Sequence, residues 1–217
     1  MAQFAIIGLG RFGSAAALEL MKMGHSVLGV DSNPKTVDKY ADQLSRAVIA
    51  DVTDKLSLEE LGLDNYDVVL VAIGTDIEAC LVSVVHLKSF GVPTIWVKAI
   101  SHAQHLILNK LGVNRIIHPE EEMGIRAAQM LSYPMINDYI ALGNGDFVVE
   151  ITVSARLDGQ TLGGVLAQHS ENVQVLLIKH RTNSTLHPDA EHILRAKDLL
   201  LLFGQLNALR SIAPKLA

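Results

Sequence analysis

Short apolar runs alternate with longer amphipathic stretches over the first 132 residues of the chain. A strand covered on both faces is apolar throughout, whereas a half-exposed strand alternates apolar with polar positions. Six such runs predict strands, with segments of helical length between them, at residues 4–7, 26–30, 47–50, 67–72, 94–97 and 115–117. This order predicts an α/β domain over residues 1–132, with a Rossmann-like, doubly wound parallel sheet.

The pattern changes after residue 134. Residues 147–153, 173–179 and 199–203 predict strands of an antiparallel or mixed sheet, residues 181–185 predict a turn, and residues 206–212 predict a short helix. These elements form a small α+β domain, which we place at residues 138–217. The sequence therefore predicts two domains that join near residues 132–137.

Composition narrows the class of protein. The 217 residues carry a net charge of -5, and this acidic balance argues against general nucleic-acid binding, which needs a basic surface. No run approaches the roughly 20 apolar residues of a membrane span. Residues 1–3 lead into the first strand without the basic region of a signal peptide, and the single Cys80 cannot form an internal disulfide. We therefore expect a cytoplasmic protein without a membrane span.

The apolar content is high for such a protein, with 49% hydrophobic residues and a mean hydropathy of +0.29. The segments IEACLVSVVHLKSF and AQHLILNKLG are apolar around most of their helical circumference. A surface helix of a monomer needs only one apolar stripe. The surplus predicts a homo-oligomer, and deep burial between sheet and second domain is the alternative.

A glycine-rich loop, GLGRFG at residues 8–13, follows the first predicted strand and opens a helix at residues 14–22. In this context Gly8 makes the tight turn, Gly10 lets the backbone approach a phosphate, and Gly13 allows close helix–strand packing. Asp31 closes the second strand, where a carboxylate accepts hydrogen bonds from ribose hydroxyls and repels a 2′-phosphate. The motif disfavours NADP and leaves NAD, ATP and ADP open.

Arg11 inside this loop bears on the choice of nucleotide. Redox enzymes commonly place small or apolar residues there, whereas a guanidinium offers a planar fork to phosphate oxygens. A triphosphate carries more charge to satisfy than a pyrophosphate diester, so Arg11 favours ATP or ADP. The plainer alternative is an exposed arginine in the first turn of a helix, where the helix dipole is slightly unfavourable.

The segment RIIHPEEEMG places three acidic residues at a helix start, of which the first is Glu120. Complementing the helix dipole explains them simply. A carboxylate at this strand end could instead hold a divalent cation beside nucleotide phosphates. His102 and His105 are three apart on a predicted helix and the other histidines are scattered, without an HExxH motif or a Cys/His cluster. No GxSxG elbow or hydride-orienting side chain is visible. We therefore expect a protein that is not an enzyme.

Several motifs together resemble the RCK domains of the cytosolic regulatory subunits of Ktr- and Trk-type potassium uptake systems. They are FAIIGLGRFG, GHSVLGVDSN, AVIADVTD, VVLVAIG, TIWVKA and GVNRIIHPEEEMG, and they extend to about residue 132. The resemblance implies a non-enzymatic subunit that binds ATP or ADP and dimerises through its Rossmann lobes. It implies an octameric ring at the inner face of the cell membrane, beneath a membrane-embedded K⁺-translocating subunit.

The resemblance also implies roles for particular residues. Arg11 matches an arginine that reaches the terminal phosphate across the dimer interface, Asp31 matches the ribose-binding acid, and Glu120 matches a carboxylate associated with a divalent cation such as Mg²⁺ or Ca²⁺. The complete set of expected nucleotide contacts is Gly8, Gly10, Arg11, Phe12, Gly13, Asp31, Ser32, Asn33, Asp51, Val52, Ile73, Gly74, Thr75, Lys98 and Glu120.

Two departures and two rival functions accompany the resemblance. Asp51 stands where some relatives have a neutral Asn, and residues 167–180 differ from relatives whose C-terminal lobes bind cyclic di-AMP, so we do not extend that ligand to this chain. An NAD(H)-dependent oxidoreductase and an NADH-sensing regulator use the same fold, and Asp31 suits all three nucleotides. The identity of the membrane partner, the activating nucleotide and the cation stay open.

Overall fold

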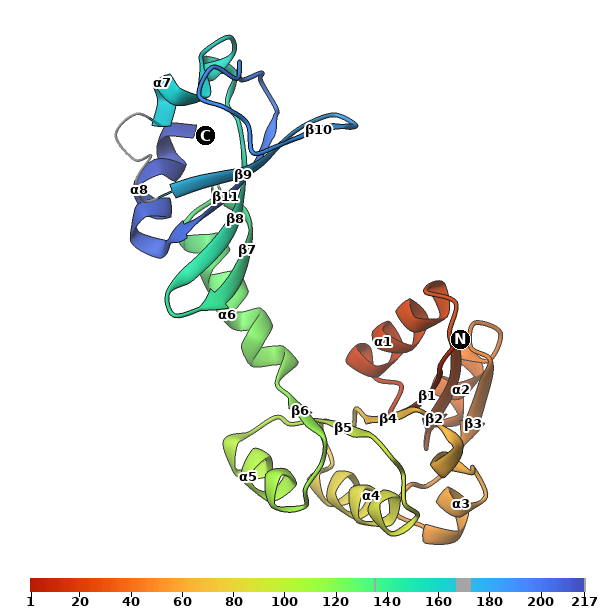
Figure 1. Ribbon diagram of the computed structural model, residues 1–217. Helices are drawn as coiled ribbons and strands as arrows, with labels where there is room; N and C mark the ends of the chain where they lie inside the picture. Colours follow the sequence, from red (N-terminus) through yellow and green to blue (C-terminus); the bar gives the residue numbers. More distant parts are fainter. Residues whose placement is uncertain (135, 167–172, 217) are drawn as a thin grey trace. The chain divides into compact units, whose positions relative to one another are not determined.

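The computed structural model describes residues 1–134, 136–166 and 173–216 (Figure 1). Residues 167–172, part of the segment 167–180 that differs from relatives binding cyclic di-AMP, lie outside these ranges. The chain forms two compact units, Met1–Glu121 and Glu122–Ala217. The units divide inside helix α6 (Pro119–Ser132), and the domain junction expected from the sequence lies at the C-terminal end of the same helix. In the described ranges, no helix has the length and apolarity to cross a membrane.

The first unit contains a parallel sheet with strand order β3-β2-β1-β4-β5-β6 (Figure 1). This arrangement confirms the predicted doubly wound sheet. The elements are β1 (Gln3–Ile7), α1 (Arg11–Lys22), β2 (Ser26–Asp31), α2 (Pro34–Tyr40), β3 (Arg46–Ile49), α3 (Lys55–Glu59), the 3-10 turn η1 (Leu63–Asn65), β4 (Val68–Val71), α4 (Ile77–Ser89), β5 (Ile95–Lys98), α5 (His102–Lys110) and β6 (Arg115–Ile117).

Apolar layers cover both faces of this sheet. Adjacent residues Ile6 and Ile7 of β1 are 1% and 0% exposed and belong to two separate core clusters. One cluster includes side chains of α1, and the other includes side chains of α3, α4 and α5. Two-sided burial is the physical reason for the continuous apolar runs in the sequence.

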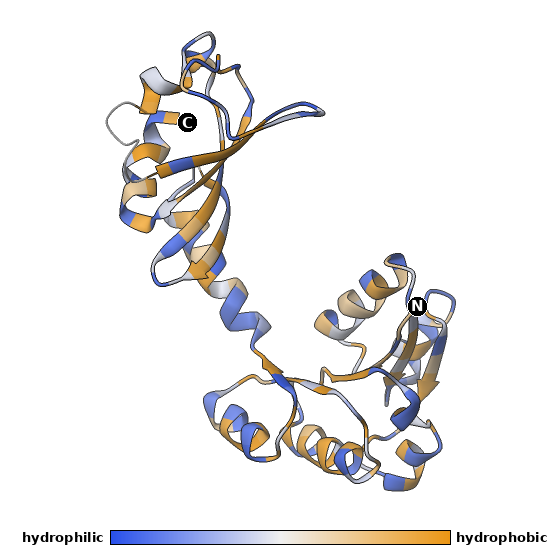
Figure 2. Ribbon diagram, viewed as in Figure 1, coloured by the Kyte–Doolittle hydropathy of each residue, from blue (hydrophilic) through white to orange (hydrophobic). Residues whose placement is uncertain are grey.

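The second unit is built on an antiparallel sheet with strand order β10-β9-β11-β8-β7, and Figure 2 shows its strands largely in the hydrophobic colour. A single core cluster joins the sheet to α8, which confirms the predicted α+β lobe. Its elements are β7 (Ile136–Gly143), β8 (Asp146–Thr152), the 3-10 turn η2 (Ala155–Leu157), α7 (Leu162–Leu166), β9 (Val173–His180), β10 (Asn183–Leu186), β11 (Leu199–Gln205) and α8 (Leu206–Leu216).

Two strands of this unit differ from the sequence-based expectation. Residues 183–185 belong to β10 and pair with β9, although the sequence predicted a turn at 181–185. Strand β7 was not predicted, and it joins β8 through Asn144 and Gly145, both with positive φ. Such a two-residue loop is typical of a tight hairpin.

Candidate nucleotide-binding site

The glycine loop joins the end of β1 to the start of α1. Gly8 has a φ of +93° and its amide donates a hydrogen bond to the Val30 carbonyl at 2.7 Å. A Cβ added to Gly13 would lie 1.9 Å from the Gly8 carbonyl oxygen, so the helix can approach the loop only with glycine at this position. A Cβ at Gly10 would meet nothing within 4 Å. The loop is therefore packed tightly on its protein side at Gly13 and open at Gly10.

Asp31 at the end of β2 ties this loop to the next one. Its carboxylate accepts hydrogen bonds from the Leu9 amide at 2.8 Å and the Asn33 amide at 2.9 Å. A carboxylate has about four lone-pair sites, so capacity remains for ligand hydroxyls. The arrangement keeps an acceptor beside the open side of the loop, at the carboxyl edge of the sheet.

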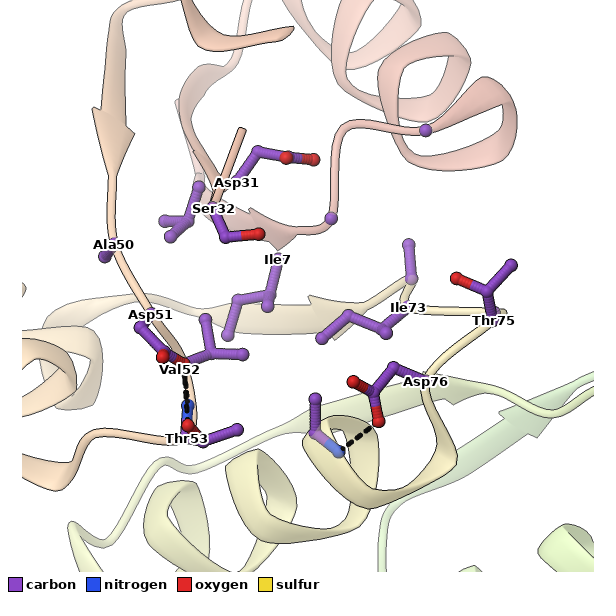
Figure 3. A pocket seen from close by; sticks show the side chains of 16 residues that line it. Ile7, Asp31, Ser32, Ala50, Asp51, Val52, Thr53, Ile73, Thr75 and Asp76 are labelled. Carbon is purple, nitrogen blue, oxygen red and sulfur yellow. Dashed lines mark hydrogen bonds between the residues drawn. The ribbon is translucent and has the colours of Figure 1, made fainter. Parts of the chain in front are cut away.

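A cavity of about 570 Å³ lies at this edge, where β1 neighbours both β2 and β4 and the strand order reverses (Figure 3). Doubly wound sheets bind ligands at this place. Of the expected contact residues, the cavity is lined by Gly8, Gly10, Asp31, Ser32, Asp51, Val52, Ile73, Gly74 and Thr75. Figure 3 shows Ile7, Val52 and Ile73 around its apolar centre, with Asp31 and Ser32 to one side.

Two acidic side chains of this cavity are held by the turns that carry them. The Asp51 carboxylate accepts hydrogen bonds from the hydroxyl and the amide of Thr53, and these bonds lower the pKa of Asp51. Asp76 caps α4 by accepting a hydrogen bond from the Ala79 amide at 2.9 Å (Figure 3). Sequence analysis missed Asp76, whose position before a helical segment was the available signal.

A second cavity, of about 700 Å³, is lined by the other charged residues of the expected nucleotide contacts. It shares Gly74 and Thr75 with the first cavity, so the two adjoin at the turn after β4. Arg11, Lys98 and Glu120 line it. The Lys98 ammonium lies 2.5 Å from a Glu120 carboxylate oxygen. The hydrogen bond from Lys98 is the main cause of the lowered pKa of Glu120, and the nearby charges of Lys98 and Arg11 add to it.

Three histidines also line the second cavity, although the sequence assigned them no role in a site. They are His102, His105 and His118, and the rings of the latter two share a hydrogen bond of 2.9 Å between Nδ1 and Nε2. The three-residue spacing of the first two was visible in the sequence. The third joins them because β6 ends beside α5 in the fold, which no local spacing reveals.

Three expected contact residues lie outside the linings of both cavities. Asn33 caps α2 by accepting a hydrogen bond from the Lys35 amide, Phe12 packs against the core cluster beneath α1, and Gly13 is covered by the loop itself. The contacts of Asn33 and Gly13 are structural, whereas the Phe12 ring also lies 5.9 Å from the Lys98 ammonium of the second cavity. Gly13 and Phe12 position the loop, and Asn33 positions the helix that follows Asp31.

The side chains that line the two cavities supply only part of the ligand set of a divalent cation. Across residues 1–134, 136–166 and 173–216, no three His, Cys, Asp or Glu side chains are grouped to hold a metal ion. Mg²⁺ is usually held by one or two carboxylates together with substrate phosphates and water, rather than by an all-protein cage. Glu120, in a cavity that adjoins the first, fits such a shared site.

Comparison with known proteins identifies relatives over nearly the whole chain. Family models match residues 4–119 as a TrkA-N domain and residues 147–217 as a TrkA-C domain. The chain is 41% identical to Ktr system potassium uptake protein A of Bacillus subtilis, over 93% of this chain and 91% of that protein. It is 39% identical to the Vibrio alginolyticus protein of the same name, over 93% and 92%.

Solved structures share the fold at low identity. The RCK domain of GsuK superposes with a TM-score of 0.66 and 16% identity over 100% of this chain, and the chain spans 48% of that structure. The GsuK channel bound to NAD superposes with a TM-score of 0.63, and the chain spans 39% of it. The sequence relatives are named for potassium uptake and not for a reaction, which confirms the prediction of a non-enzymatic protein.

Proposed function

The chain belongs to the family of proteins built from a TrkA-N and a TrkA-C domain, and we propose that it is the nucleotide-binding regulatory subunit of a potassium uptake system. ATP and ADP bind the cavity at the carboxyl edge of the parallel sheet and favour different shapes of a homo-octameric ring. The ring acts from the cytoplasmic side of the membrane on a K⁺-translocating subunit. One observation carries this proposal: the first cavity adjoins a second one that is lined by Arg11 and Lys98.

The nucleotide binds across both cavities, with its base and ribose in the first cavity and its phosphates in the second. The first offers apolar walls at Val52 and Ile73 for a base and the Asp31 carboxylate for ribose hydroxyls. The second offers the Arg11 guanidinium and the Lys98 ammonium for phosphates. A terminal phosphate carries charge that NAD lacks, which supports ATP or ADP as the ligand.

Exposed apolar side chains support assembly into an oligomer. Ile77 and Val85 of α4 are 41% and 50% exposed, and Leu106 and Ile107 of α5 are 52% and 45% exposed. These residues belong to the two segments that the sequence marked as apolar on more than one side. Contact between copies of the chain would bury these apolar side chains. In the proposed assembly, dimers form through the first units and four dimers close the ring.

The switch follows from differential affinity. A nucleotide shifts the ring only if it binds one shape more tightly than the other. Loss of one charge-assisted contact to the terminal phosphate changes the binding free energy by about 1.5–3 kcal/mol per site. Several sites that respond together can then reverse the preference of the whole ring.

Calorimetric titration of the wild type and of Arg11→Ala with ATP, ADP and NADH tests the assignment, with the oligomeric mass measured in parallel. We expect the wild type to prefer ATP and ADP over NADH, and Arg11→Ala to keep adenosine binding but lose discrimination between ATP and ADP. Arg46→Ala is the matched control, because Arg46 starts β3 at the opposite edge of the sheet.

Four results would overturn the proposal in whole or in part. Equal discrimination in Arg11→Ala and the wild type would remove Arg11 from the phosphate site. Tighter binding of NADH than of ATP would replace the proposal with an NADH-sensing regulator, and turnover of NADH with a substrate would replace it with an oxidoreductase. A monomeric mass would contradict the ring.

A further inference from the structure

The loop between β3 and α3, residues 50–54, forms one wall of the first cavity. Asp51, Val52 and Thr53 of this loop line the cavity. Inside the loop, the amide and the hydroxyl of Thr53 donate hydrogen bonds to the Asp51 carboxylate, and the Asp54 amide donates one to the Asp51 carbonyl at 3.2 Å. These bonds join residues close together in the chain, so they shape the loop but do not attach it to the rest of the first unit.

Contacts with α4 and its surroundings attach the loop. The Val52 side chain is 7% exposed and belongs to the core cluster that includes side chains of α4. The Thr53 carbonyl oxygen lies 3.2 Å from Nε2 of His86, which belongs to α4. A carbonyl oxygen can only accept a hydrogen bond, so Nε2 carries the hydrogen and the imidazole is the donor. The Val52 side chain and the Thr53 backbone are therefore held separately.

The surroundings of His86 fix the direction of its ring. The imidazole stacks on the Phe90 ring, with centroids 6.4 Å apart and an interplanar angle of 25°. Phe90 itself packs against the core of the first unit. His86 is half-buried, and a hydrogen bond away from open water is electrostatically stronger than one made in it. A donor held in one direction restricts the positions that the Thr53 carbonyl can take.

Helix α4 also bounds the first cavity directly. Asp76 caps the helix and Ala79 lies in its first turn, and both line the cavity. Ala79 and His86 are seven residues apart, so they lie on the same face of the helix. Figure 3 shows Val52 on one side of the cavity and Asp76, at the start of α4, on the other. One helix thus supplies part of the wall and holds the loop that forms another part.

We propose that His86 is a positioning residue for the base end of the nucleotide site. Its hydrogen bond to Thr53 holds the backbone of the loop in the place that the base requires. A loop already held in its binding position loses less conformational freedom when the ligand binds, so affinity increases. His86 is not among the residues that line the two cavities, and it acts through Thr53. This inference rests on the proposed function.

Calorimetric titration of the full chain with ATP and with ADP tests this role. His86→Leu removes the donor and keeps an apolar side chain of moderate size. We expect both nucleotides to bind about fivefold more weakly, because one hydrogen bond no longer holds the loop. The ratio of the two affinities should stay at the wild-type value, since ATP and ADP share the base and ribose and differ only at the phosphates.

Two polar replacements separate the donor from the packing of the ring. His86→Gln places an amide N–H near the position of Nε2, so it should restore most of the affinity. His86→Asn is one bond shorter and cannot reach the Thr53 carbonyl, so it should bind as weakly as His86→Leu. His25→Leu is the matched control, because His25 directly precedes β2 at the amino end of the sheet and contacts the Ala2 amide.

Hydrogen exchange of the Thr53 amide in nucleotide-free protein measures the loop directly. Exchange should be about fivefold faster in His86→Leu and His86→Asn, and close to the wild-type rate in His86→Gln and His25→Leu. If His86→Leu unfolds, the comparison of His86→Gln with His86→Asn carries the test.

Three results would overturn the role of His86 alone: wild-type affinities in His86→Leu, a weakening that falls on ATP only, or equal exchange rates in His86→Gln and His86→Asn. Failure of the wild type to bind either nucleotide would contradict the proposed function, and this inference with it. The two failures are therefore distinguishable, because the first requires a wild type that binds or an exchange rate measured without nucleotide.

Discussion

The two units use neighbouring strand residues in different ways. In β2 of the first unit, Val27 and Leu28 are 0% and 1% exposed because apolar layers cover both faces of the sheet. In β11 of the second unit, Leu200 and Leu202 are fully buried, but Leu201 between them is only half-buried. A continuous apolar run therefore does not by itself establish two-sided coverage.

The units also differ in how far their paired carboxylates are buried. Asp198 of the second unit is 1% exposed, and its two oxygens accept hydrogen bonds from the His180 ring and the Arg195 amide. Glu120 of the first unit accepts a hydrogen bond from Lys98, and its side chain stays 66% exposed. The hydrogen bond from the Arg195 amide to Asp198 closes a turn and leaves the Asp198 carboxylate buried. The Lys98–Glu120 pair leaves the Glu120 carboxylate accessible. This contrast explains why we assign ligand binding to the first unit.

The largest effect is expected at the glycine loop of the first unit. Gly13→Ala places a Cβ 1.9 Å from the Gly8 carbonyl oxygen, so helix α1 must move away from the loop. We expect a loss of more than about 4 kcal/mol in the unfolding free energy of the first unit, and loss of nucleotide binding. Denaturant unfolding followed by the fluorescence of Trp96, the single tryptophan, measures the first effect.

Gly10→Ala is the matched control for this variant. Its Cβ meets no protein atom within 4 Å and its φ of -64° suits alanine, so the stability should change little. Nucleotide binding should weaken nevertheless, if the open side of the loop faces a phosphate. Normal stability of Gly13→Ala would contradict the packing that we describe.

The next largest effect is a difference in stability between substitutions on the two faces of the sheet in the second unit. Leu202→Ala removes a fully buried side chain from the core beneath α8, and we expect a cost of about 3 kcal/mol. Leu201→Ala, one residue away on the other face, should cost about 1 kcal/mol. Hydrogen exchange of the β8 and β11 amides measures both. Equal costs would show that the second face is covered as fully as in the first unit.

Burial explains which elements the sequence could predict. All six strands of the parallel sheet were predicted. The four central strands β2, β1, β4 and β5 are largely buried, whereas the edge strands β3 and β6 are only partly buried and were recognised by their short apolar runs. Strand β7 mixes polar and apolar residues and is largely exposed, and all four residues of β10 are exposed. These are the edge strands of their sheet. Backbone hydrogen bonds hold such strands, and the hydropathy pattern does not record those bonds.

The site was predictable where it follows from local sequence. The glycine loop and Asp31 belong to one strand–helix–strand segment with a recognisable pattern. The pairing of Lys98 with Glu120, and of His105 with His118, depends on the neighbouring positions of β5, α5 and β6 in space. Asn33 was expected as a nucleotide contact, and in the structure its side chain caps α2 directly before Pro34.

The smallest effect concerns a single sulfur atom, and it measures the opening of the first unit alone. Cys80 of α4 is fully buried and is the chain's single cysteine. Burial raises the pKa of its thiol to about 11, against a small lowering by the Gln104 amide. A raised pKa favours the neutral thiol, so reactivity should stay low at pH 8 and increase as the pH rises toward 11.

With a thiolate fraction of roughly 0.1%, reaction of Cys80 with a disulfide reagent at pH 8 should be at least about 100-fold slower than in urea-unfolded protein. Labelling at rising urea concentrations then gives the opening free energy of the first unit, for comparison with exchange at β11. A native rate equal to the unfolded rate would contradict the burial of α4 against the parallel sheet.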